Sequence, residues 1–181
     1  MDIRRLYIFV EGNDDERFFR RIILPELDNR YQSIKIIQYS QMPMKKRMAF
    51  IKSIDSMPEA DYIKIRDIDY FPCVTALKQN IKKHIKCIEV SKIFVVIKEI
   101  ESWYLAGISD EAIEKLKVRR RTERTDKVTK ERFYTVIKNK IGAINIMMEI
   151  LESFSIRKGV KRNRSFRYFV VKMGIDYNKD E

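Results

Sequence analysis

Short apolar runs alternate with amphipathic stretches over the N-terminal half of the chain. Leu6 to Val10 is a continuous apolar run of branched and aromatic residues, which predicts a strand buried on both faces. A helix is expected directly after it, capped by Asn13 or Asp14 and ended by Pro25. The apolar face of this helix would consist of Phe18, Phe19, Ile22 and Ile23.

Further strands and helices continue the same alternation. The predicted strands are Ser33 to Tyr39, Asp61 to Arg66 and Ile93 to Ile97, and the last of these is the most apolar run in the chain. Helices are predicted from Lys45 to Met57, from a first turn that contains Pro72, and within Lys98 to Ala106. Strands that alternate with helices, with little hairpin-turn chemistry between them, predict an α/β fold whose mainly parallel sheet is flanked by helices.

The last third of the sequence is strongly basic and contains no predicted strand. Lys117 to Arg132 is rich in arginine and lysine and is expected to form an exposed loop. Phe133 to Phe154 carries apolar residues at helical spacing and predicts one long amphipathic helix, although Gly142 weakens its middle. Arg157 to Lys172 is basic and contains no acid. We therefore expect an α/β core over residues 1–116 and a basic, helical C-terminal region over residues 117–181 that packs on it, as one domain overall.

Charge and the rare residue types narrow the range of functions. The formal net charge of +12 favours a polyanionic partner such as nucleic acid, although a basic surface can also serve only to keep a protein in solution. A single histidine, and two cysteines without paired spacing, argue against His-based triads, most zinc sites and a disulfide framework. Neither of the common glycine-rich phosphate-binding motifs occurs. The N-terminal apolar run is too short for a signal peptide or a membrane span, so we expect a cytoplasmic protein with no membrane partner.

Acidic side chains follow three of the predicted strands at the point where each strand ends. Glu11 follows the first strand, Asp67 and Asp69 follow the third, and Glu99 and Glu101 follow the last. Ligands of parallel α/β sheets bind outside the carboxyl ends of the strands, and the two aspartates of a DxD in an extended segment point to the same side. A carboxylate cluster without His or Cys suits Mg²⁺ or Mn²⁺. Taken singly, each acid is better explained as a turn or cap residue, but acids at three strand ends together favour a metal site.

The order of these motifs resembles the TOPRIM domain, a metal-dependent fold shared by topoisomerases, bacterial primases, overcoming-lysogenization-defect nucleases and recombination-repair proteins. That family has a glutamate and a glycine after its first strand and a DxD after a later one. Here VEGNDD (residues 10–15) and RDIDYF (residues 66–71) supply these features. More narrowly, VEGNDDERFF, KEIESWYLAG (residues 98–107) and RNRSFRYF (residues 162–169) resemble an uncharacterised TOPRIM-like family related to RloB proteins. Gly107 stands where members of that family often carry an acid.

The resemblance implies roles for the residues that match these motifs. Glu11 would act as general acid/base or metal ligand, and Asp67 and Asp69 would bind Mg²⁺ or Mn²⁺, as one or two ions. Glu101, or less favourably Glu99, would complete this catalytic cluster, while Gly12 and Asp15 would support it from the start of the helix.

Several arginines are candidates for contacts with nucleic acid, because the guanidinium fork matches the oxygens of a phosphate. They are Arg119, Arg120 and Arg121 in the basic segment and Arg162, Arg164 and Arg167 near the C-terminus. The C-terminal segment equally fits a basic amphipathic helix that buries Phe166 and Phe169, and both interpretations can hold together. Trp103 is expected in the core rather than on a base-stacking surface.

Two functions of different classes compete at this point. The first is a Mg²⁺-dependent TOPRIM-like nuclease that cleaves phosphodiester bonds in DNA or RNA; the resemblance also implies defence against foreign genomes and an ATPase partner. The second is a non-catalytic nucleic-acid-binding TOPRIM scaffold that works with a partner ATPase. A phosphoryl transferase or ligase ranks lower because no nucleotide-binding loop is present. Both leading candidates predict salt-sensitive binding, and only metal-dependent strand scission separates them.

Overall fold

The computed structural model describes residues 5–118, 123–137 and 142–178. The chain divides into two compact units, Met1–Val95 and Val96–Glu181. Residue 116, the predicted end of the α/β core, lies inside the second unit.

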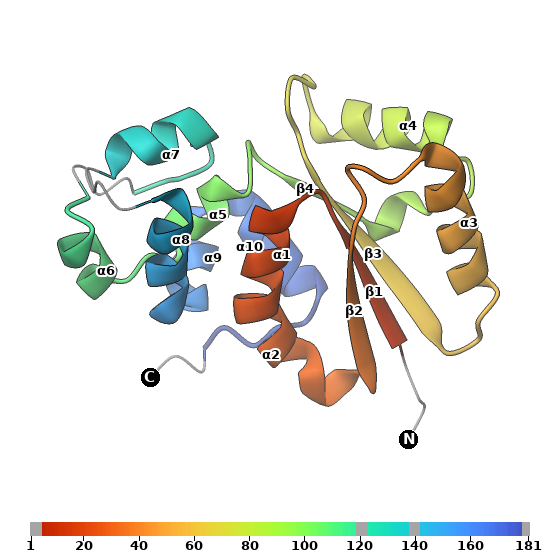
Figure 1. The fold of residues 1–181 in the computed structure, drawn as a ribbon, viewed down its shortest axis with the longest axis horizontal. Helices are drawn as coiled ribbons and strands as arrows, with labels where there is room; N and C mark the ends of the chain where they lie inside the picture. The colour runs from red at the N-terminus through yellow and green to blue at the C-terminus, as the bar shows by residue number, and fades with distance from the viewer. Residues whose placement is uncertain (1–4, 119–122, 138–141, 179–181) are drawn as a thin grey trace. The chain divides into compact units, whose positions relative to one another are not determined.

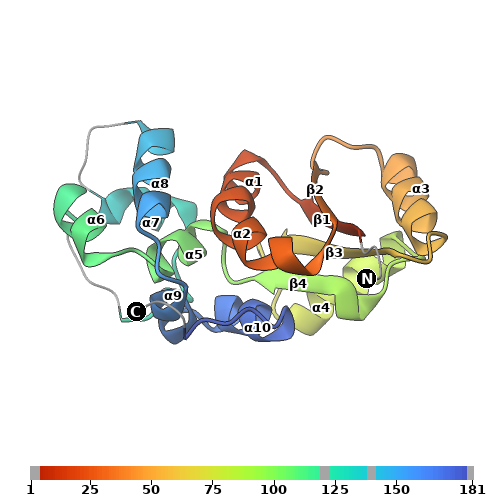
Figure 2. The same cartoon turned by 90° about the horizontal axis from the view of Figure 1, so that it is seen from below.

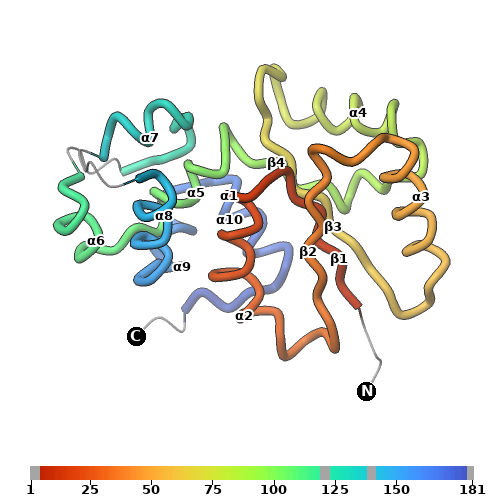
Figure 3. Tube along the Cα trace, in the orientation of Figure 1, coloured from red at the N-terminus to blue at the C-terminus, as the bar shows by residue number. Residues whose placement is uncertain are grey.

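The first unit is built on parallel strands. β1 (Arg5–Val10) lies between β2 (Ser33–Gln38) and β3 (Ala60–Asp67) and pairs in parallel with both, as Figures 1 and 3 show. β4 (Ile93–Val96) completes the order β2-β1-β3-β4. Ile8 of the central strand β1 lies opposite Ile36 and Ile63, which explains why this strand is an unbroken apolar run. The predicted α/β fold with a parallel sheet flanked by helices is confirmed, and the arrangement is consistent with a Rossmann-like fold.

Helical connections join these strands. They comprise α1 (Asn13–Phe18), the π-helix η1 (Phe19–Ile23), α2 (Leu24–Leu27), the 3-10 helix η2 (Asp28–Arg30), α3 (Met44–Asp55), α4 (Val74–His84) and the 3-10 helix η3 (Val90–Lys92). Figure 2 shows α1 and α2 on one side of the strands and α4 on the other. This follows from topology, because the connections from β1 to β2 and from β3 to β4 run in opposite directions across the sheet, so right-handed crossovers place their helices on opposite faces.

Two predictions about proline are wrong. The helix after β1 does not end at Pro25, because the winding continues through η1 into α2, where Pro25 lies in the first turn. The first N–H groups of a helix have no partner within it, so proline is tolerated there. Pro72 does not lie in the first turn of a helix either. Cys73 is the N-cap of α4, and a turn in which Phe71 N–H donates to Ile68 O occupies the preceding residues.

The second unit is helical. Its helices are α5 (Glu101–Ala106), α6 (Asp110–Lys115), α7 (Lys130–Val136), α8 (Ala143–Glu152), α9 (Ile156–Arg162) and α10 (Arg164–Lys172). Trp103 packs against Phe166 and Phe169, with ring centroids 5.1 and 5.4 Å apart, and all three side chains are fully buried. The predicted core position of Trp103 and the predicted burial of both phenylalanines are confirmed. Gly107 ends α5 under the ring of Phe154, where any Cβ would collide with that ring.

Two predictions about the basic C-terminal region are wrong. Phe133 to Phe154 is not one helix, because α7 ends at Val136 and α8 begins only at Ala143, with Gly142 as its N-cap. Ile137 instead pairs with Val118 in an isolated antiparallel bridge. Nor is the stretch before α7 simply an exposed loop: Thr125 and Val128 are buried, and the Thr125 N–H donates to Arg162 O.

Candidate active site

Arg66 holds the carboxylates of Glu11 and Asp69 at the carboxyl end of the strands. Glu11 directly follows β1, and Arg66 is the penultimate residue of the neighbouring strand β3. Arg66 Nη1 lies 2.5 Å from Glu11 Oε1, and Arg66 Nη2 lies 2.5 Å from Asp69 Oδ2. All three side chains are partly buried. Burial by itself lowers the pKa of Arg66, but the surrounding Tyr39, Glu11 and Asp69 outweigh it and raise that pKa.

Strand alternation explains why Arg66, and not Asp67, faces Glu11. Phe9 lies opposite Lys64 in the parallel register, so these two side chains share one face of the sheet. Two residues further along each strand, Glu11 and Arg66 fall on that same face. Asp67 alternates to the opposite face, although one of its carboxylate oxygens is also buried.

Asp69 reaches Arg66 because the chain turns after β3. The strand ends at Asp67, and Asp69 has a φ of 50°, in the left-handed region that aspartate tolerates better than most residues. The prediction that the DxD segment stays extended is therefore wrong. The turn places the Asp69 carboxylate beside the side chain three residues before it, and so brings Glu11 and Asp69 together through one guanidinium.

The start of α1 fixes the backbone that carries Glu11. Asp15 Oδ2 accepts a hydrogen bond of 3.1 Å from the Gly12 N–H, and the Asp15 side chain is buried. Gly12 O in turn accepts from the Glu16 N–H at 3.0 Å. Gly12 and Asp15 thus hold the turn between β1 and α1, the position in which a supporting role is predicted for them.

The donor chemistry at Glu11 and Asp69 fits a hard divalent cation. Glu11 Oε2 is buried and has no hydrogen-bond partner among the residues that the structure describes. Within those same residues, no group of three or more His, Cys, Asp or Glu side chains is arranged to hold a metal ion. Mg²⁺, however, is commonly held by only one or two carboxylates together with substrate phosphates. Glu11 and Asp69 are two carboxylates of this kind, and in this structure Arg66 holds both of them.

Glu99 and Glu101 belong to the second unit, where Lys130 engages both. Lys130 Nζ lies 3.2 Å from Glu101 Oε1, and the Lys130 backbone N–H donates to Glu99 Oε2 at 2.5 Å. The Glu101 side chain is almost fully buried, and this burial raises its pKa although Lys130 acts in the opposite direction. Through this ion pair Glu101, at the start of α5, contacts Lys130, at the start of α7.

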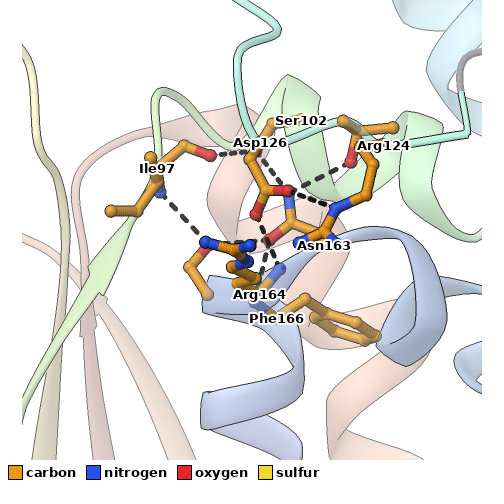
Figure 4. Close-up of polar contacts among 9 residues, drawn as sticks. Ile97, Ser102, Arg124, Asp126, Asn163, Arg164 and Phe166 are labelled. Carbon is orange, nitrogen blue, oxygen red and sulfur yellow. Dashed lines mark hydrogen bonds and ion pairs between the residues drawn. The ribbon is translucent and has the colours of Figure 1, made fainter.

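A buried polar network explains much of the RNRSFRYF motif (Figure 4). Asn163 Oδ1 accepts from the Phe166 N–H and the Ser165 hydroxyl, and Asn163 Nδ2 donates to Ser102 and Thr125. Ser165 Oγ accepts from Trp103 Nε1 at 2.9 Å and from the Ile97 N–H at 3.2 Å. The asparagine and the serine of the motif are therefore structural residues.

The arginines of the same motif are placed differently. Arg164 and Arg167 are exposed on α10, and Arg162 at the end of α9 is partly exposed. The Arg164 backbone N–H, at 2.7 Å from Asp126 Oδ1, fixes the start of α10 and leaves its guanidinium at the surface. Arg119, Arg120 and Arg121 lie outside the described residues.

Sequence reasoning missed Arg66 and Lys64. Both were interpreted only as charged neighbours of apolar strand residues, yet β3 lies next to the central strand and is covered by helices. A basic residue on such a strand has to be buried or to face a site, and Lys64 is only 4% exposed. The alternation of DYIKIRD was the available signal.

Comparison with known proteins gives no relative. No family model matches the chain, and neither a curated protein nor a solved structure is significantly similar to it. Across the described part of the chain, no helix is both long enough and apolar enough to cross a membrane.

Proposed function

We propose that this protein is a TOPRIM-like, Mg²⁺-dependent nuclease that cleaves phosphodiester bonds in DNA or RNA. The observation that carries the proposal is that the guanidinium of Arg66 brings together the carboxylates of Glu11 and Asp69. These two acids follow adjacent parallel strands, β1 and β3. The net charge of +12 supports a polyanionic substrate. Defence against foreign genomes and an ATPase partner belong to this proposal through the resemblance of the sequence motifs alone.

Glu11 and Asp69 would hold the metal ion, whereas Asp67, which alternates to the opposite face of β3, remains a candidate ligand through the motif resemblance alone. A bound Mg²⁺ would supply charge stabilisation at the phosphoryl oxygens and a water of lowered pKa. Arg66, once freed from the two carboxylates, offers a planar fork that matches phosphate oxygens. The residues of the chain therefore bind and orient the substrate phosphate, and the Gly12–Asp15 turn keeps Glu11 in place.

Cleavage of a supercoiled plasmid and of labelled single-stranded DNA and RNA tests the proposal directly. Each substrate is incubated with Mg²⁺, Mn²⁺ or EDTA and with the parent, Glu11→Gln, Asp67→Asn or Asp69→Asn proteins. Asp55→Asn, which removes an exposed acid at the end of α3, is the matched control. We expect metal-dependent cutting by the parent and the control and a loss of at least about a hundredfold in the three site variants. Intact substrates under every condition would rule out the nuclease.

The Arg66 bridge provides a second readout that does not depend on activity. In Arg66→Met two carboxylates face each other without a cation, so millimolar Mg²⁺ should raise the melting temperature of this variant by roughly 3 °C more than that of the parent. Adding Asp69→Asn to Arg66→Met should remove this response. If Mg²⁺ affects the parent and both variants equally, the two carboxylates are not a metal site.

One observation favours the alternative of a non-catalytic nucleic-acid-binding scaffold that works with a partner ATPase. Arg66 already neutralises Glu11 and Asp69, so the acids have a structural explanation without any metal. Salt-sensitive binding of nucleic acid without metal-dependent cutting would support this alternative.

A further inference from the structure

The first unit contains an open pocket of about 280 Å³ between β3, α3 and α4. Apolar side chains of α4 and its C-terminal end, including Leu77, Ile81 and Ile85, form part of its wall. The remaining wall is unusual for a pocket of this size, because it is cationic and aromatic. The volume lies just below the range that small-molecule sites in proteins usually occupy, which begins at roughly 300 Å³. It therefore suits a ligand of nucleotide size rather than a folded chain.

Two cations of the pocket lie against the same aromatic ring. Lys64 Nζ lies 2.9 Å from the centroid of the Tyr39 ring, and the guanidinium carbon of Arg47 lies 5.2 Å from it. Tyr39 is itself buried and donates its hydroxyl proton to Ile65 O at 2.9 Å, which fixes the ring. The sheet and α3 thus hold two positive groups at one place.

Neither cation has an acidic partner among the described residues. Arg47 donates only to the backbone oxygens of Met42 and Ser40, and no ion pair joins either Arg47 or Lys64 to a carboxylate. Burial, and after it the positive charges of Arg47 and Arg66, hold the pKa of Lys64 well below its usual value, against the opposing effect of Glu11 and Asp15. A buried ammonium group beside a second cation is costly to keep unless an anion joins them.

Two stacked aromatic side chains also line this pocket. Tyr70 is 88% exposed and stacks on Phe71, with ring centroids 5.1 Å apart and ring planes 18° apart. Both residues line the pocket together with the two cations. An exposed, preordered aromatic face of this kind is a common platform for a nucleobase.

We propose that this pocket binds a nucleoside monophosphate, either as the phosphorylated end of a nucleic acid strand or as a free nucleotide. The phosphate monoester, with a charge of about −1.5 to −2 at neutral pH, would join Arg47 and Lys64 and neutralise them. The base would stack on Tyr70. His84, whose Nδ1 contacts Asn80 O at 2.8 Å, also lines the pocket.

Binding of a nucleotide in this pocket does not depend on the proposed nuclease activity; only its suggested part in cleavage rests on that proposed function. Arg66 lines the pocket and also bridges Glu11 and Asp69, so a nucleotide held here would lie next to the candidate active site. Its binding is expected without any divalent cation. A binding measurement in EDTA therefore tests this inference alone, and its result does not depend on whether the protein is a nuclease.

Calorimetric titration of the full chain in EDTA tests the inference. The ligands are AMP, UMP, adenosine, inorganic phosphate, and short oligonucleotides with 5′-phosphate, 3′-phosphate or hydroxyl ends. The variants are Arg47→Gln, Lys64→Met and Tyr70→Ala. Lys52→Gln is the matched control, since it removes one exposed positive charge from the same helix as Arg47 without touching the pocket.

We expect AMP and UMP to bind at least about tenfold more tightly than adenosine, because the charged hydrogen bonds are to the phosphate. Arg47→Gln and Lys64→Met should weaken AMP at least about tenfold and Lys52→Gln less than about twofold. Tyr70→Ala should weaken AMP about fivefold or more, while leaving inorganic phosphate unchanged. Tighter binding of phosphorylated strand ends than of AMP would identify the strand end as the ligand, and the reverse order would identify a free nucleotide.

Three results would overturn the inference. They are the absence of AMP binding at millimolar concentration, equal binding of AMP and adenosine, and an equal loss of affinity in Lys52→Gln and Arg47→Gln. Arg47 is partly exposed on α3, so Arg47→Gln is expected to fold. The test therefore remains valid even if the buried substitution Lys64→Met prevents folding.

Discussion

At the residue scale, Lys64 is a charged side chain in apolar and aromatic surroundings within the first unit. The residue lies on β3, next to the central strand, and is almost completely buried against the ring of Tyr39. Desolvation of its ammonium group works against folding, and the charges of Glu11 and Asp15 compensate for it only in part. A group that weakens the fold in this way is a candidate for function.

Replacing Lys64 with methionine should therefore stabilise the protein. The pKa of Lys64 is lowered in the folded state from its usual 10.5, so the unfolded chain binds more protons between the folded-state pKa and 10.5. The stability of the parent consequently rises with pH through that window, and the penalty is complete below it. We expect Lys64→Met to add at least about 1 kcal/mol to the free energy of unfolding at pH 7, and the advantage to shrink as the pH approaches 10.

Urea unfolding at both pH values measures this difference. Lys35→Met, at an exposed position on β2, is the control and should change stability by less than about 0.5 kcal/mol. If Lys64→Met is less stable than the parent at pH 7, the ammonium group makes a favourable interaction that outweighs its desolvation.

Single residues also show how far the candidate site could be predicted. Acids at the ends of β1 and β3 were visible in the sequence, because Glu11 follows an apolar run and Asp69 follows a stretch of alternating apolar and charged residues. Their partner Arg66 was not, because the register that aligns it with Glu11 depends on strand order. The left-handed turn at Asp69 was not visible either, since aspartate allows that conformation without requiring it.

At the element scale, the start of α10 organises the second unit. Asn163 caps this helix and at the same time links Ser102 of α5 to Thr125 of the segment before α7. Both polar atoms of its side chain are used inside a fully buried network. Its environment therefore demands an amide and accepts no apolar replacement.

Asn163→Ala should lower the free energy of unfolding by about 2–4 kcal/mol, since it removes a cap and leaves buried partners unsatisfied. Asn163→Asp keeps the acceptor for the Phe166 N–H but loses both donors, so its effect should also be large. Arg164→Ala, at the exposed neighbouring position, is the control and should stay within about 0.5 kcal/mol of the parent. Denaturant unfolding followed by Trp103 fluorescence reports on this unit, and equal stability of Asn163→Ala and the parent would contradict the assigned role.

Elements were predictable where burial alone defined them. The continuous apolar runs at β1 and β4 needed both faces covered, and this fixed their type. Helix ends were not predictable in the same way: a π-helix joins α1 to α2, which contains Pro25 in its first turn, and Gly142 caps a new helix. The β-bridge between Val118 and Ile137 joins residues far apart in the sequence, so the local hydrophobic periodicity could not predict it.

At the scale of the whole molecule, the net charge of +12 is consistent with the proposed polyanionic partner but does not identify the surface that would contact it. Some lysines and arginines already form ion pairs, as Lys115 does with Glu149 and Lys158 does with Asp110. Arg164 and Arg167 are exposed on α10, and no ion pair to either side chain occurs within the described residues. Long-range attraction of a nucleic acid depends on all of these charges, whereas direct contacts with phosphates require basic side chains that are not in ion pairs.

The salt dependence of nucleic acid binding tests this distinction. If Arg164 and Arg167 contact phosphates, the double change Arg164→Gln/Arg167→Gln should weaken binding of a short duplex and reduce the slope of log K against log salt by about 2. The matched control Lys115→Gln/Lys158→Gln removes the same charge from the same unit, but each lysine already has an acidic partner. It should therefore reduce the slope by less than about 1. Fluorescence anisotropy over a salt series in EDTA measures both, and equal slopes for the two double variants would mean that net charge, and not α10, governs binding.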